Sequence, residues 1–120
     1  MNCTFCKIMN NELPSYTIYE DEVVKVFLSI DPISNGHTLI VPKNHYLDID
    51  DIPVDVLSHV NEISKKIATL LKEKLNYTGL KIVQNNGFLQ EVKHYHLHVI
   101  PFFNKENKED IKKIYEILKK

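Results

Sequence analysis

The sequence lacks the features of a membrane protein, a secreted protein or a nucleic-acid-binding protein. It has no run of the roughly 18 to 20 apolar residues that a transmembrane helix needs, and its first residues lack the basic, apolar and small-residue order of a signal peptide. Positive charge is not in excess, because 15 Lys and Arg residues stand against 16 Asp and Glu residues, for a net charge of -1. Such a chain has no strong positive field to hold a polyanion. We therefore expect a cytoplasmic protein that binds neither a membrane nor a nucleic-acid polymer.

Cysteine is scarce, since the chain has only Cys3 and Cys6. In a reducing compartment, two cysteines separated by two residues more often bind a metal or do redox chemistry than form a structural disulfide. A hydrophobic core must then supply the stability. The 120 residues, 43% of them hydrophobic and 26% charged, are sufficient for one such core. We expect a single domain over residues 1–120.

The spacing of apolar residues predicts a mixed α+β domain. From position 54 to about 75 these residues recur every three or four positions, which predicts one long amphipathic helix. The same spacing between Asn107 and Lys120 predicts a C-terminal helix that Asn107 caps. A short helical segment is expected near the N-terminus. Strands are predicted over residues 17–20, 23–28, 37–41, 80–84 and 93–102.

The pentapeptide His94-Tyr95-His96-Leu97-His98 is the strongest chemical signal in the chain. Side chains alternate between the two faces of a strand, so the three histidines are expected on one face. Mere solvent exposure would also put histidines on one face, but three of them leading into the apolar Val99-Ile100-Pro101 favour a chemical role. That role is either nucleophilic catalysis or metal binding.

Further motifs occur in chain order with this pentapeptide, and together they resemble the histidine-triad (HIT) family of nucleotide hydrolases and transferases, in particular its small Hint-like branch. The motifs are Phe5-Cys6-Lys7-Ile8, Tyr19-Glu20-Asp21, Gly36-His37-Thr38-Leu39-Ile40-Val41-Pro42-Lys43, Asn85-Asn86-Gly87 and Gln90-Glu91-Val92. The similarity covers about residues 3–103 and leaves 104–120 as a C-terminal helical tail. It implies the HIT-like fold, which has an antiparallel sheet of about five strands, one long helix, a short N-terminal helix and a C-terminal helix.

The resemblance implies a hydrolase that cleaves at the α-phosphate of a purine nucleotide derivative, through a covalent nucleotidyl intermediate on His96. Candidate substrates are AMP or GMP derivatives, namely nucleoside phosphoramidates, aminoacyl adenylates and dinucleoside polyphosphates. A neutral imidazole has one donor and one acceptor nitrogen, so a hydrogen bond to a backbone carbonyl would leave the other nitrogen free to attack. His98 and His37 would contact the phosphate or the leaving group, where negative charge builds.

The nucleotide-binding residues are implied by the same resemblance. Asn85 and Gln90 would be neutral donors near the phosphate, although the loop before Gln90 is about two residues shorter than is usual in the family. Ser29 stands where the family usually has an aspartate that binds the ribose, and a serine hydroxyl can bond a ribose without supplying charge. The apolar slot for the base would be formed by Phe5, Ile8, Phe27, Leu28 and Ile30.

A structural zinc ion is a further implication of the resemblance. Several bacterial-type members hold zinc on a cysteine pair, on a histidine after the Pro-Lys motif and on the first histidine of the triad. In this sequence these residues are Cys3, Cys6, His45 and His94. Two thiolates and two imidazoles suit a closed tetrahedral Zn²⁺ site. Small members of the family also generally form homodimers, and we expect the same here.

Two alternatives to the nucleotide hydrolase stay open. In the first, His94, His96 and His98 together bind a catalytic zinc ion, although positions on one face of a strand lie roughly 6.5 to 7 Å apart and metal ligands usually come from more than one element. In the second, the chain is a nucleotide-binding module without turnover.

His59, in the long predicted helix and outside every motif, is expected at the surface.

Overall fold

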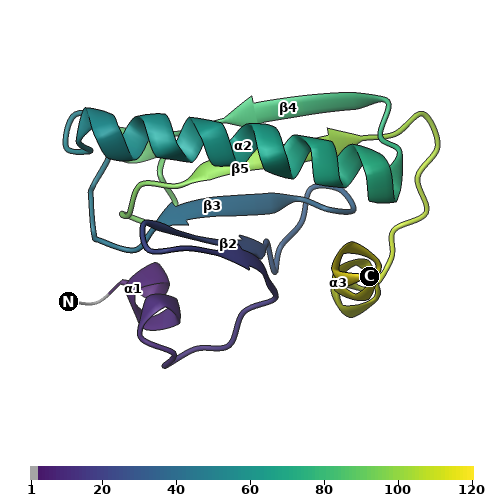
Figure 1. The fold of residues 1–120 in the computed structure, drawn as a ribbon, viewed down its shortest axis with the longest axis horizontal. Coiled ribbons are helices and arrows are strands. Elements are labelled where there is room, and N and C mark those ends of the chain that lie inside the picture. The colour runs from purple at the N-terminus through teal and green to yellow at the C-terminus, as the bar shows by residue number, and fades with distance from the viewer. Residues whose placement is uncertain (1–2) are drawn as a thin grey trace.

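The computed structural model describes residues 3–120, and its central element is an antiparallel sheet of five strands in the order β1-β2-β3-β5-β4 (Figure 1). The strands are β1 (Thr17–Glu20), β2 (Val24–Leu28), β3 (Thr38–Pro42), β4 (Gly79–Val83) and β5 (Leu97–Phe102). The helices are α1 (Thr4–Met9), α2 (Val54–Leu75) and α3 (Ile111–Lys119), with a 3-10 turn, η1, at Gly87–Leu89. The α+β architecture expected from the sequence is confirmed.

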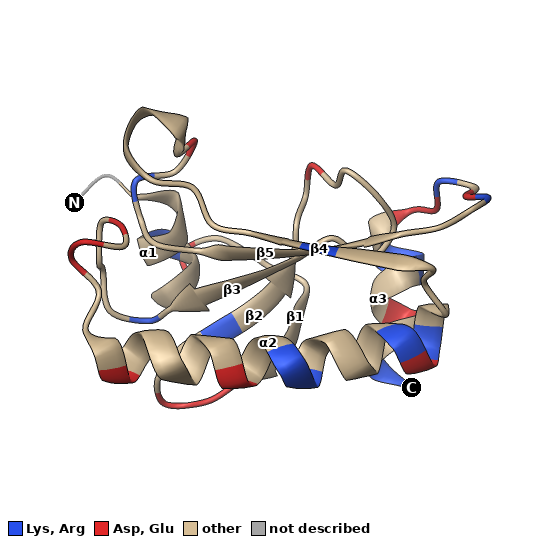
Figure 2. Cartoon of the chain, turned by 90° about the horizontal axis from the view of Figure 1, so that it is seen from above, with Lys and Arg blue, Asp and Glu red and all other residues tan. Residues whose placement is uncertain are grey.

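Helix α2 covers one face of the sheet. Its buried residues Val60, Ile63, Ile67 and Leu71 recur every three or four positions and pack in one core with the side chains of β2 and β3 that point to the same face. The charged side of α2 faces away from the sheet (Figure 2). The helix ends where Asn76 adopts the left-handed conformation with φ 55°. The amphipathic periodicity therefore predicted both ends of this helix.

A smaller cluster lies on the opposite face of the sheet. Phe27 of β2 and Leu39 and Val41 of β3 alternate with the residues that face α2, and they pack against Phe5 and Ile8 of α1. The chain can form a helix as short as α1 because this cluster buries its apolar side. The cluster holds α1, together with Cys3 and Cys6, on this face of the sheet.

Strand β5 is shorter than the sequence predicts. It begins at Leu97 rather than at residue 93, because its pairing with β3 starts at Ile40 and Leu97. Before this point the chain runs toward another segment, and the N–H of Tyr95 donates to the carbonyl of Tyr46 at 2.6 Å. The prediction that all three histidines lie on one strand is wrong, since two of them precede it.

Two further expectations need correction. The C-terminal helix begins at Ile111 and its cap is Asp110, whose carboxylate accepts from the N–H of Lys112, rather than Asn107. His59 is not a plain surface residue. It is partly buried, and its Nε2 lies 2.6 Å from the carboxylate of Asp21, so it joins α2 to the turn between β1 and β2.

Within residues 3–120, no helix is long and apolar enough to cross a membrane.

Candidate active site and metal centre

Two cysteines and two histidines meet at the first turn of α1. The ligand atoms of Cys3, Cys6, His45 and His94 all lie within 4.8 Å of one another. The Nδ1 atom of His94 is 3.3 Å from the Sγ of Cys3 and 3.5 Å from the Sγ of Cys6, and His45 Nδ1 is 3.2 Å from the Sγ of Cys6. Tetrahedral Zn²⁺ with ordinary bond lengths holds S and N ligands about 3.6 Å apart. The spacing and chemistry of these four side chains fit that ion.

His94 presents the correct nitrogen to this cluster. Its Nε2 lies 2.8 Å from the carbonyl oxygen of Pro42, and because a carbonyl can only accept, Nε2 carries the hydrogen and donates. The lone pair is then on Nδ1, which faces the two cysteines. Burial lowers the pKa of His94 to about 4, so the ring is neutral at pH 7, as a metal ligand must be.

The ring of His96 is fixed in the complementary way. Its Nδ1 lies 2.7 Å from the carbonyl oxygen of His94, so Nδ1 carries the hydrogen and the lone pair is on Nε2. The residue is 5% exposed, and its ring makes a T-shaped contact with the ring of Phe5, with centroids 4.9 Å apart. Burial lowers the pKa of His96, while the hydrogen bond to the His94 carbonyl and, to a smaller extent, the carboxylate of Glu91 partly oppose this effect. His96 is therefore a neutral, oriented imidazole with a free lone pair on Nε2.

His37 and His98 form a hydrogen-bonded pair beside His96. The N–H of Ile33 donates to His37 Nδ1 at 3.1 Å, so the hydrogen of His37 is on Nε2. That Nε2 donates to His98 Nδ1 at 2.9 Å, which leaves the hydrogen of His98 on its own Nε2. The rings of His98 and His96 lie 4.8 Å apart between centroids. Burial lowers the pKa of both His37 and His98 to about 4, so the pair is neutral at pH 7.

The polar residues expected to bind the nucleotide lie in two loops. Ser29 is partly buried at the end of β2, and its hydroxyl accepts from the N–H of Asp31 at 3.2 Å. Gln90 is 5% exposed, donates from Nε2 to the carbonyl of Leu47 at 2.6 Å, and has no partner for Oε1 among the described residues. Asn85 is partly buried just before η1. The buried acceptor on Gln90 was not predicted from the sequence.

The apolar residues expected to hold a base do not form one cluster. Phe5, Ile8 and Phe27 pack together on the α1 face. Leu28 is the next residue along β2 and therefore points to the opposite face, where it joins the core under α2. Ile30 is 84% exposed. The expectation of a five-residue slot is corrected for Leu28, which lies on the wrong side of the sheet.

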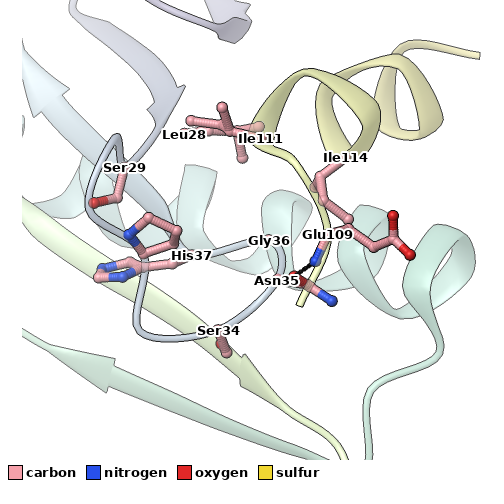
Figure 3. A pocket seen from close by; sticks show the side chains of 10 residues that line it. Leu28, Ser29, Ser34, Asn35, Gly36, His37, Glu109, Ile111 and Ile114 are labelled. Atoms are coloured by element: carbon pink, nitrogen blue, oxygen red, sulfur yellow. Dashed lines mark hydrogen bonds between the residues drawn. The ribbon is translucent and has the colours of Figure 1, made fainter. Parts of the chain in front are cut away.

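Leu28 lines a different hollow, between the β2–β3 connector and α3 (Figure 3). Ser29 and His37 line the same hollow from the connector, and Ile111 and Ile114 line it from α3. The C-terminal helix therefore lies beside a connector that carries two of the expected site residues. Nothing in the sequence pattern predicted this contact.

The alternative with three histidines around one metal ion is not supported by the geometry. The metal-binding group found among residues 3–120 contains His94 with Cys3, Cys6 and His45, and it contains neither His96 nor His98. His94 turns its free nitrogen toward the cysteines, whereas His98 accepts from His37. The triad is thus divided between two sites.

The fold and the divided histidine site define a protein of the histidine-triad class. A family model for the HIT domain matches residues 10–105. The chain belongs to this family.

Similar proteins support this assignment. An uncharacterised HIT-like protein of Methanocaldococcus jannaschii is 50% identical over 101 residues, which cover 82% of this chain and 78% of that protein. The adenosine 5′-monophosphoramidase of Candida albicans is 41% identical over 106 residues, 83% of this chain and 70% of the relative. The crystal structure of a zinc-bound histidine-triad protein of Mycobacterium smegmatis has a TM-score of 0.92 at 34% identity and covers 99% of this chain and 91% of that one. The expected HIT-like fold is confirmed, and the zinc-bound relative supports a zinc site at the cysteine and histidine cluster.

Proposed function

We propose that this chain is a nucleotide hydrolase that cleaves the P–N bond of a purine nucleoside phosphoramidate, with His96 as nucleophile. One observation carries the proposal: His96 is buried and neutral, and it donates from Nδ1 to the carbonyl of His94, so that Nε2 keeps its lone pair. The similarity to an adenosine 5′-monophosphoramidase favours adenosine as the nucleoside.

The reaction has two steps. In the first, the Nε2 lone pair of His96 attacks the α-phosphorus, the P–N bond breaks, and the leaving amine takes a proton from the site or from water. In the second, water attacks the phosphorus, the bond to Nε2 breaks, and the nucleoside monophosphate leaves while the proton of water passes to solvent. In this mechanism the Nε2–H of His98, whose ring centroid lies 4.8 Å from that of His96, donates to the phosphate oxygen on which charge develops.

Other side chains are assigned to binding. Ser29 contacts the ribose, and Asn85 and Gln90 contact the phosphate. The base lies against Phe5 and Ile30, with Ile8 and Phe27 supporting Phe5 from behind. An aminoacyl adenylate or a dinucleoside polyphosphate presents the same α-phosphate, so these compounds are the second class to be assayed.

Zinc has a structural role in this proposal. When bound by Cys3, Cys6, His45 and His94, the ion has four protein ligands and no open position for a reactant. Its contribution is to hold the segment around His94, whose carbonyl accepts from His96. The chain's own backbone thereby orients the nucleophile.

A homodimer is part of the proposal. Strand β4 lies at one edge of the sheet and, among the residues that the structure describes, pairs with β5 alone, so its outer edge has free backbone groups. Ile82 on this strand is 50% exposed and Phe102 at the end of β5 is 40% exposed. A second copy pairing there would cover both the free edge and these apolar side chains.

The test is hydrolysis of adenosine 5′-phosphoramidate by the wild type and by His96→Ala. The variant is expected to lose essentially all turnover while its thermal unfolding stays cooperative, and mass spectrometry of quenched wild type should detect one added AMP on the peptide that contains His96. A matched control is His59→Ala, which removes a partly buried histidine on the opposite face of the sheet and should leave turnover intact. Near-normal hydrolysis by His96→Ala would refute the assignment. No turnover by the wild type would favour the non-catalytic binding module.

A further inference from the structure

The connector between β2 and β3, residues 29–37, is held from outside by the segment 106–109 that precedes α3. The N–H of Glu109 donates to the side-chain oxygen of Asn35 at 3.0 Å (Figure 3), and the Nδ2 of Asn35 donates to the carbonyl of Asn107 at 2.9 Å. Segments far apart in the sequence are thus bonded directly to each other. The C-terminal tail forms part of the surroundings of this connector.

Lys108 adds a positive charge to this contact. Its Nζ donates to the carbonyl oxygens of Pro32 at 3.1 Å and Ile33 at 2.9 Å. The Pro32 carbonyl belongs to the same peptide group as the N–H of Ile33, and that N–H donates to His37 Nδ1 at 3.1 Å. A cation bound to the oxygen of a peptide group polarises it and makes its N–H a stronger donor. The ammonium of Lys108 therefore acts on one end of the peptide group whose other end bonds His37.

The hydrogen bonds continue from this peptide group to the histidine beside the nucleophile. His37 can accept at Nδ1 only in the neutral tautomer that carries hydrogen on Nε2. It then donates to Nδ1 of His98, which must in turn carry its hydrogen on Nε2. The tautomer of His98 is thus coupled to the orientation of a peptide group that His98 does not touch.

We propose that Lys108 is a positioning residue for the hydrolysis proposed above: through the peptide group that it binds, it keeps His37 and His98 in the tautomer with hydrogen on Nε2. This tautomer is the one in which His98 presents an N–H donor to the charge that develops on the phosphate. Lys108 is exposed and its hydrogen bonds are to the connector, so it acts on the two histidines through the peptide group that it binds and through its charge. The expected effect on kcat rests on the proposed function, whereas the tautomers of His37 and His98 can be measured without a substrate.

The charges around His37 are consistent with this role. Burial is the main cause that lowers the pKa of His37 to about 4, the neighbouring His96 and Lys108 lower it further, and Asp31 opposes them. His37 is consequently neutral at pH 7, which the hydrogen-bond chain requires.

The experiment compares Lys108→Met with Lys108→Arg and with Lys105→Met in the full chain. Arginine keeps a cationic donor at position 108. Lys105 lies in the same segment, and its side chain makes no hydrogen bond or ion pair among the described residues, so it controls for the loss of one lysine. Two quantities are measured: the ¹⁵N signals of the imidazole rings of His37 and His98 without substrate, and kcat and KM for adenosine 5′-phosphoramidate.

In the wild type, both rings should show a protonated Nε2 and an unprotonated Nδ1. Lys108→Met should move these signals toward a mixture of tautomers and lower kcat roughly three- to tenfold with little change in KM, the effect of weakening about one hydrogen bond at the transition state. Lys108→Arg should restore both readouts, and Lys105→Met should match the wild type.

The inference is overturned if either ring of the wild type carries its hydrogen on Nδ1, or if Lys108→Met leaves the ring signals as they are in Lys105→Met. It is also overturned if the ring signals change in Lys108→Met and show the same change in Lys108→Arg. Absence of hydrolysis by the wild type would refute the proposed function, while the ring signals would still decide the role of Lys108.

Discussion

Replacement of Gly36 by alanine should both destabilise the protein and disturb its site. Gly36 precedes His37 and has φ +89°, in the left-handed region that residues with a Cβ rarely adopt, which costs about 1 kcal/mol. A Cβ there would lie 2.6 Å from Cδ1 of Leu75, 3.2 Å from Cγ of Pro101 and 3.3 Å from Cδ2 of Leu71. Leu75 can rotate because it is only partly buried, whereas Leu71 is fully buried, so overpacking should add about 1 to 2 kcal/mol.

The expected loss in the free energy of unfolding is therefore about 2 to 3 kcal/mol, measured by urea denaturation. Gly87→Ala is the matched control, since Gly87 has φ +63° but nothing lies within 4 Å of the added Cβ. This control should lose only about 1 kcal/mol. Because the Gly36 variant shifts the connector, its hydrolysis of adenosine 5′-phosphoramidate should also fall. Equal destabilisation by the two variants would refute the packing argument, since they share only the strained φ.

The remaining predictions concern the metal, the site histidines and the dimer. Purified protein should contain about one zinc per chain by elemental analysis, and Cys3→Ser with Cys6→Ser should remove it and lower the melting temperature; metal-free wild type of equal stability would contradict this. Hydrolysis should persist as the pH falls through 6.5, because His96, His37 and His98 act as neutral rings and burial lowers the pKa of all three, that of His37 and His98 to about 4; a decline centred near pH 6.5 would show that at least one of these rings has an ordinary pKa. Light scattering should give about twice the mass of one chain, with Ile82→Lys reducing it; a monomeric wild type would exclude the dimer.

The long helix could be predicted from the sequence because its signal is local. The apolar residues that pack on the sheet, from Val60 to Leu71, recur at the period of a helix, and the structure places α2 at Val54–Leu75 as the periodicity indicates. Strand β5 was less predictable. Its start depends on where β3 offers a partner, and this begins only at Leu97. A run of alternating residues cannot indicate where a neighbouring strand ends.

The expectation that Leu28 lines the base slot was wrong because of the geometry of a strand. Phe27 and Leu28 are adjacent in β2 and so must point to opposite faces, whichever face the site occupies. The contact between Lys108 and the connector could not be predicted from the sequence either. No periodicity or motif distinguishes it from the other lysines of the tail, and only the docking of that tail beside Pro32 brings it to the connector.

The sequence by itself determined the residue types that carry the chemistry, because the three alternating histidines, the cysteine pair and the amphipathic helix are patterns of neighbours in the chain. The tertiary structure decided which nitrogen of each histidine is bonded and which is free. Cys3 and His94 are 91 positions apart, and their contact at 3.3 Å assigns His94 to the metal cluster. The carbonyl of His94 then leaves Nε2 of His96 free, while the N–H of Ile33 determines the hydrogen on His37. An imidazole's role depends on which partner each of its nitrogens meets, and those partners are supplied by the fold.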